Sequence, residues 1–246
     1  MRIVFLSLVA ILFANCLPPK TYYLNKNYRF EQEKVKIALF PLQWSAITIN
    51  NPDDIKKHFK GCSEEPEEIV MDSGYKYIAQ GINDTIKKAS FFWLQSVDPN
   101  ISQNNMNFIN VDKKIGKDSI LFSFKVPNRN EFNQLFKDAN AAIIIDRIEL
   151  NKNSTNIGSG AMMGPMGGSG GRIMMGGGSS NIKYFEAKVT YLVWDYDKNE
   201  IISCGLTDNA AGYLFLPNQK TWKSLFINTG RRIASLTPFK KPQNSM

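Results

Sequence analysis

Histidine is almost absent from this chain: His58 is the single histidine among 246 residues. A Ser-His-Asp or Cys-His catalytic site would have to use that residue as its base. His58 lies within Lys56–Lys60, a cationic segment with no carboxylate beside it in sequence to orient an imidazole. We therefore expect a surface or helix-face histidine, and the sequence gives little support to nucleophilic catalysis of this kind.

Cysteine is also scarce, with three residues in the chain. No local spacing supplies the nitrogen and sulfur ligands of a zinc site. The chain also lacks a Gly-Lys-Ser/Thr loop and a glycine fingerprint between a strand and a helix, so we expect no nucleotide or other cofactor. Cys62 and Cys204 leave two interpretations open. They either form a disulfide in an oxidising compartment or are two buried free thiols.

Long apolar runs are missing except at the start, where Ile3–Ala14 follows Met1-Arg2 and leads to Asn15-Cys16. This run is shorter than the roughly 20 residues of a bilayer-spanning helix, and it has the layout of a secretory signal. The leader resembles that of bacterial lipoproteins, although Phe13 and Asn15 differ from the residues usual in their cleavage box.

The resemblance implies cleavage before Cys16 and acylation of that cysteine, with palmitate among the acyl chains. Because Leu17 rather than Asp follows, it also implies an outer-membrane location, on the periplasmic face in preference to the cell surface. The alternative is an ordinary secretion signal or a buried N-terminal strand, with Cys16 incidental.

The formal net charge is +8 and the isoelectric point is near 9.3. Basic proteins often bind nucleic acid by neutralising phosphates. An exported protein rarely meets nucleic acid, so we expect no such partner and favour anionic lipid or acidic envelope polymers. Most of this charge serves to keep the surface solvated.

The order of apolar segments predicts an α/β (α+β) fold in a single domain over residues 35–236. We expect a mixed sheet of about five strands with helices packed on it and a late antiparallel hairpin. The strands are expected near residues 35–41, 91–94, 141–150, 182–194 and 200–213, and the helices at 73–89, 131–137 and 221–235. Outside this domain we expect a signal peptide (1–15), a lipidated tether (16–34) and a tail (237–246).

Residues 157–180 are rich in glycine and methionine, and they predict a disordered insertion in the domain. Thioethers are soft ligands that suit Cu(I), so this loop offers a weak copper site. The candidate ligands are Met162, Met163, Met166, Met174 and Met175. The alternative is a flexible, mildly apolar loop that touches a membrane or a partner.

Three segments together resemble a periplasmic α/β module. The first is Lys36–Pro41, a basic-apolar strand stopped by proline, and the second is Phe136–Ile145, a helix end that turns into a strand. The third is Val189–Asp195 with Asn199–Ile202, a hairpin in which Asn-Glu replaces a Thr-Gly turn. The module occurs in curli-secretion (CsgG-like) lipoproteins, in penicillin-binding-protein activator lipoproteins and in the N-terminal domain of the Tol-system propeller protein. The resemblance implies a non-catalytic envelope component that binds another protein or assembles with itself.

The sequence thus favours a lipid-anchored envelope protein that is not an enzyme. Two alternatives remain open. One is a hydrolase of envelope polymers, which would need a pair of suitably spaced carboxylates. The other is a carrier of a metal or small ligand that uses the methionine-rich loop.

Overall fold

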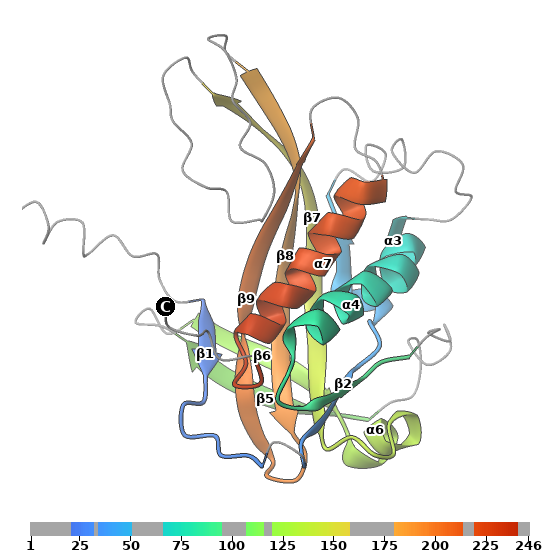
Figure 1. The fold of residues 1–246 in the computed structure, drawn as a ribbon, viewed down its shortest axis with the longest axis vertical. Helices are drawn as coiled ribbons and strands as arrows, with labels where there is room; N and C mark the ends of the chain where they lie inside the picture. The colour runs from blue at the N-terminus through green and yellow to red at the C-terminus, as the bar shows by residue number, and fades with distance from the viewer. Residues whose placement is uncertain are drawn as a thin grey trace, which may run out of the picture.

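The structure is a computed structural model that describes residues 21–31, 34–50, 66–94, 107–115, 120–157, 180–213 and 219–240. Three long antiparallel strands form its centre: β7 (Ala141–Ile157), β8 (Ser180–Asp195) and β9 (Glu200–Tyr213) (Figure 1). Ala141–Ile145, at the start of β7, is buried on both faces, as is typical of a central strand.

Four short strands complete a seven-stranded mixed sheet. β1 (Tyr22–Leu24) pairs antiparallel with β9, while β2 (Lys36–Leu39) lies parallel to both β7 and β4 (Ser90–Phe92). β3 (Ile47–Ile49) pairs in parallel with the next part of β7. The strand order is therefore β1-β9-β8-β7-β2-β4, with β3 beside β7.

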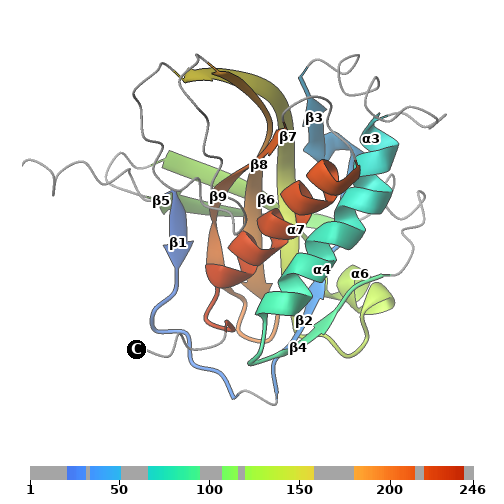
Figure 2. The same ribbon diagram turned by 45° about the horizontal axis from the view of Figure 1, so that its top comes forward.

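Helices cover one face of this sheet (Figures 1 and 2). A first helical stretch consists of α3 (Pro66–Ile69), a π-helical turn (Val70–Gly74) and α4 (Tyr75–Thr85), and the second helix is α7 (Gln219–Ser235). The two helices cross at a pair of glycines. A Cβ atom on Gly81 would lie 2.1 Å from the Ile227 carbonyl oxygen, and one on Gly230 would lie 2.1 Å from that of Ile78. Only residues without a side chain permit this approach of the two backbones.

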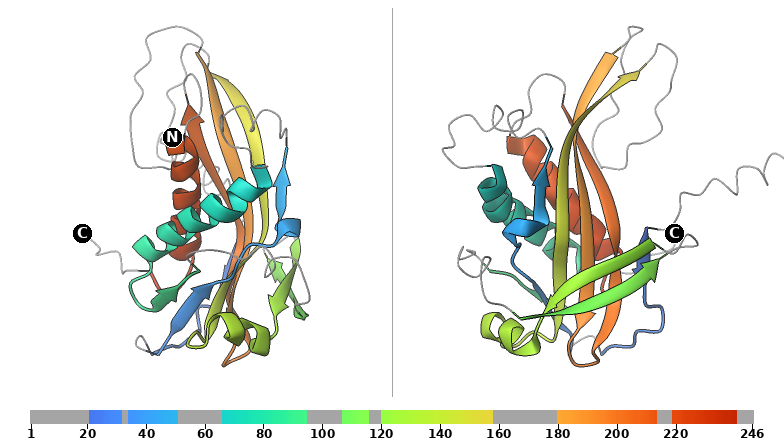
Figure 3. Two further views of the ribbon diagram at one scale, coloured as in Figure 1. Left: turned by 90° about the vertical axis from the view of Figure 1, so that its right-hand side faces the viewer. Right: turned by 180° about the vertical axis from the view of Figure 1, so that it is seen from behind.

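The opposite face carries a separate two-stranded layer (Figure 3). β5 (Phe108–Ile115) and β6 (Ile120–Pro127) form an antiparallel pair, and α6 (Arg129–Leu135) follows directly. Beneath them lies a second apolar core, distinct from the one under the helices. Its buried members are Ala38, Phe40, Ile115, Phe124, Val126, Phe132, Phe136, Ala139, Ala142, Ile144, Leu192, Trp194 and Cys204.

A β-bulge interrupts the pairing of β7 with β8 at Asp146. Before it, Ile143 and Ile145 face the helices, and after it Ile148 and Leu150 face them as well. The Asp146 carboxylate accepts a hydrogen bond from the Lys125 backbone N–H of β6, which ties the two-stranded layer to the sheet. The bulge thus places Ile148 and Leu150 on the same side of the sheet as Ile143 and Ile145.

The predicted fold class is confirmed, and all five predicted strands are present in the sheet. Several other expectations are wrong. The sequence does not indicate β3, β5 and β6 as strands, because β3 is short and polar residues interrupt the apolar residues of β5 and β6. The helix expected to begin at Ser73 begins at Pro66, and Ser73 lies inside it.

The predicted tether and tail are also partly wrong. Tyr22–Leu24 pairs with β9 in the sheet and Tyr28 is buried, so this part of the predicted tether belongs to the fold. Phe239 is fully buried, so the fold extends beyond the predicted boundary at residue 236. The insertion expected over residues 157–180 is shorter by one residue at each end, because Ile157 ends β7 and Ser180 begins β8. Its interior lies outside the described residues.

Candidate functional site

Most of the site residues proposed from the sequence lie outside the described residues. This holds for Cys16, for Cys62, for His58 and for the five methionines of the insertion. Cys204 is described, and it is a fully buried free thiol on β9. Burial raises the pKa of Cys204 to about 12, so the thiol packs here as a small apolar side chain. Because Cys62 lies outside the described residues, the disulfide and the two buried free thiols both stay predictions.

The turn between β8 and β9 is built around Asp195. One carboxylate oxygen of Asp195 accepts the backbone N–H groups of Asp197 and Lys198 at 2.8 and 3.0 Å. The other accepts the hydroxyl of buried Tyr28 at 2.6 Å, and burial together with this carboxylate raises the pKa of Tyr28 far above its ordinary value. These internal contacts occupy the carboxylate, so the turn is structural. Within the described ranges no group of three His, Cys, Asp or Glu residues is placed to hold a metal ion.

Polar side chains gather instead on the sheet face that is turned away from the helices. The two-stranded layer covers the first part of this face, and none of the described elements covers the part beyond it (Figure 3). Strand alternation places polar residues there, since their neighbours Phe185, Ala187 and Val189 point into the helix-side core. We call this surface the polar face; it consists of Arg147, Glu149, Asn151, Asn153, Tyr184, Glu186, Lys188, Thr190, Leu206 and Asp208.

Two carboxylates meet at the centre of the polar face. Glu186 of β8 and Asp208 of β9 are diagonal neighbours across the strand pair, and their side chains are in hydrogen-bonding contact. Asn153 donates a hydrogen bond of 3.0 Å to Glu186, and the Lys188 ammonium lies 3.8 Å from the same carboxylate. Together these contacts fix the Glu186 side chain, of which 17 % is exposed.

The surroundings of Glu186 disfavour its charged form. Partial burial raises the pKa of Glu186 above its ordinary value, and repulsion from the Asp208 carboxylate raises it further. Lys188 and the Asn153 amide act in the opposite direction. A cation placed beside the pair would relieve this repulsion, so the pair favours a positively charged ligand group.

The polar face differs in charge from the chain as a whole. Glu149, Glu186 and Asp208 face two cations, Lys188 and Arg147, and the Arg147 guanidinium lies 3.4 Å from Glu149. The surface is therefore slightly acidic on a protein whose formal charge is +8. A surface of this kind steers and orients cationic partners.

The sequence contained a partial signal for the polar face. In β8 the residues Glu186, Lys188 and Thr190 alternate with apolar ones, which indicates a strand with one polar side. The contact of Glu186 with Asp208 depends on the register of β8 against β9. That register was not assigned from the sequence, and so the carboxylate pair was missed.

Among the described residues, no helix combines the length and the apolar character that crossing a bilayer requires.

Comparisons with known proteins identify no family for the chain. No family model matches it, and no curated protein matches it. Solved structures with a related arrangement include a PelC variant dodecamer from Paraburkholderia phytofirmans, with 9% identity and a TM-score of 0.38, covering 89% of this chain and 99% of that one. A hypothetical protein from Chlamydia trachomatis has 10% identity and a TM-score of 0.37, with 82% and 98% of the two chains covered.

A neuraminyllactose-binding hemagglutinin homolog from Helicobacter pylori is similar at 10% identity and a TM-score of 0.33, with 89% of each chain covered. All three proteins come from bacteria. TM-scores of this size carry no argument about what this chain does.

Proposed function

We propose that the protein is a non-catalytic binding or assembly component of the bacterial envelope. In this proposal acyl chains on Cys16 hold it on the outer membrane, and the polar face binds a cationic surface of a protein partner. The leader that ends in Cys16 supports the anchor. The observation that carries the binding role is the Glu186–Asp208 pair, held on a rigid three-stranded platform that none of the described elements covers.

The polar face suits binding because its parts are fixed before a partner arrives. Its side chains project from the middle of long paired strands, where the backbone has little freedom to rearrange. Preorganised groups lose little conformational entropy on binding, which favours affinity. The residual negative potential around Glu186 and Asp208 would be matched by lysine or arginine side chains of the partner.

The contact between Glu186 and Asp208 also bears on the hydrolase alternative. Glycosidases hold their two carboxyl groups about 5 to 9.5 Å apart, which leaves room for the sugar or for a water molecule. Two carboxyl groups in mutual hydrogen-bonding contact are closer than that. The pair therefore supports binding in preference to glycoside hydrolysis.

The binding role is tested by capture of partners from envelope extract. Wild type is compared with a Glu186→Gln/Asp208→Asn double variant and with Asp112→Asn, which removes a carboxylate from the exposed side of β5. We expect one dominant protein to be captured by wild type and Asp112→Asn, and captured at least roughly tenfold less by the double variant, since charge pairs that become buried in an interface contribute a few kcal/mol. Equal capture by all three contradicts the role of the polar face.

The anchor and the absence of catalysis are tested separately. A palmitate analogue should label wild type and leave Cys16→Ala unlabelled. Turnover of peptidoglycan fragments by the wild type, lost in the double variant, would favour the hydrolase instead.

A further inference from the structure

We propose that the tip of the β5–β6 hairpin docks on an anionic lipid surface and fixes the orientation of the protein on its membrane. The hairpin tip is defined here by Lys113 and Lys114 at the end of β5 and by Ile120 and Leu121 at the start of β6. The inference rests on the proposed function, because it takes Cys16 as the attachment point of the acyl chains.

Two large apolar side chains are exposed at the hairpin tip, one on each face of β6. Ile120 is 47% and Leu121 56% exposed, although Ile115, the direct cross-strand partner of Ile120, is 4% exposed in the second core. Behind the tip, Phe122 and Phe124 stack with ring centroids 5.9 Å apart, and Phe124 is fully buried. The tip is thus an apolar end on a firmly packed base.

Positive charge accompanies this apolar end. Lys114 is exposed and pairs directly across the strands with Leu121. Lys113 extends over the ring of Tyr23 in β1, with its ammonium 3.8 Å from the ring centre. Asp112, one pair further back, offsets one of these charges. Lysines beside apolar side chains are the combination that holds a peripheral protein in the headgroup region of an anionic bilayer.

The start of the fold brings the proposed acyl chains to the same place. Thr21 is hydrogen-bonded to Leu206 of β9 at 2.8 Å, directly before β1, so the chain is fixed to the sheet from this residue onward. The five residue steps from Cys16 to Thr21 span at most about 17 Å when fully extended. β1 lies beside the hairpin tip in Figures 1 and 2, and Lys113 contacts Tyr23. A lipid at Cys16 therefore keeps the tip within reach of the bilayer.

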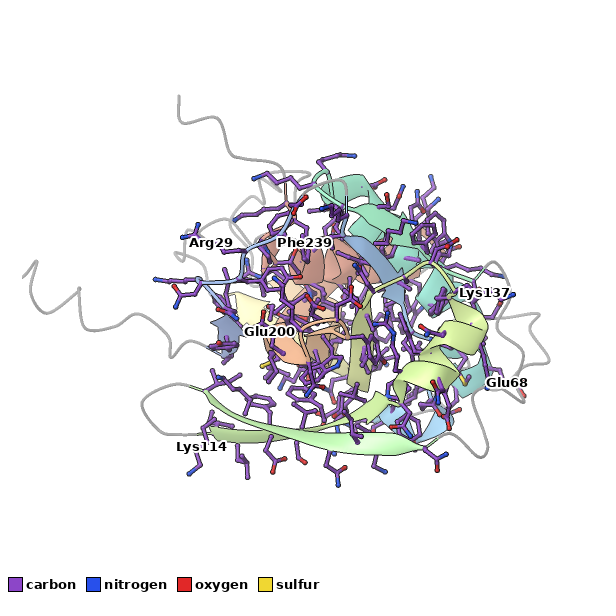
Figure 4. All side chains as sticks on the ribbon, turned by 90° about the horizontal axis from the view of Figure 1, so that it is seen from below. Arg29, Glu68, Lys114, Lys137, Glu200 and Phe239 are labelled. Carbon is purple, nitrogen blue, oxygen red and sulfur yellow. The ribbon has the colours of Figure 1, made fainter. Side chains whose placement is uncertain are left out.

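The hairpin tip projects at the margin of the molecule. Seen from below in Figure 4, the β5–β6 layer forms one side of the protein, with Lys114 near one end and Lys137, after α6, toward the other. Contact at the Lys114 end would orient the whole sheet on the membrane, since the hairpin is packed against the second core.

The experiment uses the full chain, purified from envelopes and reconstituted in phosphatidylethanolamine–phosphatidylglycerol vesicles. In a Cys62→Ser background, Leu121→Cys receives an environment-sensitive dye, and a matched control carries the dye at Asn130→Cys on the exposed side of α6. Buried Cys204 is shielded from labelling, and an acylated Cys16 has no free thiol. Mass spectrometry of the N-terminal peptide reports acylation of Cys16 independently.

We expect the emission maximum of the dye at position 121 to shift to shorter wavelength when the protein is on the vesicles. Lipids with brominated acyl chains should quench its fluorescence at least roughly twofold more than that of the dye at position 130. Adding Lys114→Glu should reduce the quenching in these vesicles, because attraction to the anionic surface is lost. An acylated Cys16 with no difference between the two positions overturns the docking alone and points to a protein partner for the tip. An unmodified Cys16 overturns the anchoring and, with it, the docking.

Discussion

The two faces of the central sheet are closed in different ways. The helix side is covered by two helices that meet backbone to backbone at Gly81 and Gly230 and enclose a large apolar core. The other side is apolar only where β5, β6 and α6 cover it, and beyond them it carries the polar face. This difference separates residues that hold the fold together from residues that are available to a partner.

The strongest test of this comparison is Phe124→Ala. Phe124 is fully buried between the hairpin and the sheet, so its loss removes apolar contacts and leaves a cavity. We expect the free energy of unfolding to fall by about 3 to 5 kcal/mol, measured by urea denaturation. Leu121→Ala on the same strand is the control, since Leu121 is exposed and its truncation should cost less than about 0.5 kcal/mol. Similar losses for the two variants would show that the hairpin covers no real core.

Gly230→Ala tests the helix side. The added methyl group would meet the Ile78 carbonyl oxygen, which belongs to backbone and cannot rotate away, so the two helices must separate. We expect a loss of about 1 to 3 kcal/mol in urea denaturation, typical of an overpacked core. At Gly74 a Cβ would meet only the Phe226 ring, at 3.3 Å, so Gly74→Ala should be milder. A Gly230→Ala variant that loses no more stability than Gly74→Ala would contradict the close crossing of α4 and α7.

Much of the helix side was predictable, and the reasons are local. Ile78 and Ile82 recur at helical spacing, and the run Ala141–Ile145 is long and unbroken, so the periodicity alone indicates a helix and a buried strand. β5 and β6 were missed because Asp112, Lys113 and Lys114 interrupt the alternation, and only the packing of Phe124 and Val126 against the sheet makes the pair stable.

The polar face was less predictable than the fold. Single strands showed alternation, but Glu186 and Asp208 are 22 positions apart in the printed sequence and meet only through the register of β8 and β9. A bulge in that pairing, near Trp194, shifts the register in a way that no turn motif in the sequence reveals.

The smallest expected effect concerns Glu186 and pH. The pKa of Glu186 is raised in the folded protein, so the folded state binds a proton more readily than the unfolded state does. The wild type should therefore gain stability relative to Glu186→Gln as the pH falls from neutral toward about 4.3, the ordinary pKa of glutamate. Urea denaturation across this range measures the difference.

Asp208→Asn serves as the control for this pH dependence. It removes one cause of the raised pKa, so the pH dependence of its stability should be weaker than that of the wild type. A wild type that instead loses stability relative to Glu186→Gln on acidification would contradict the repulsion between the two carboxylates.

The bulge at Asp146 takes up one residue of β7 without turning the strand over. Ile145 pairs with Tyr191 and Arg147 with Thr190, so deleting Asp146 would leave a regular ladder in which Ile148 and Leu150 still face the helices. The deletion would instead remove the carboxylate that accepts a hydrogen bond from the Lys125 backbone N–H. The length of β7 at this point therefore serves the attachment of the two-stranded layer, and its loss should loosen that layer while the two faces of the sheet keep their residues.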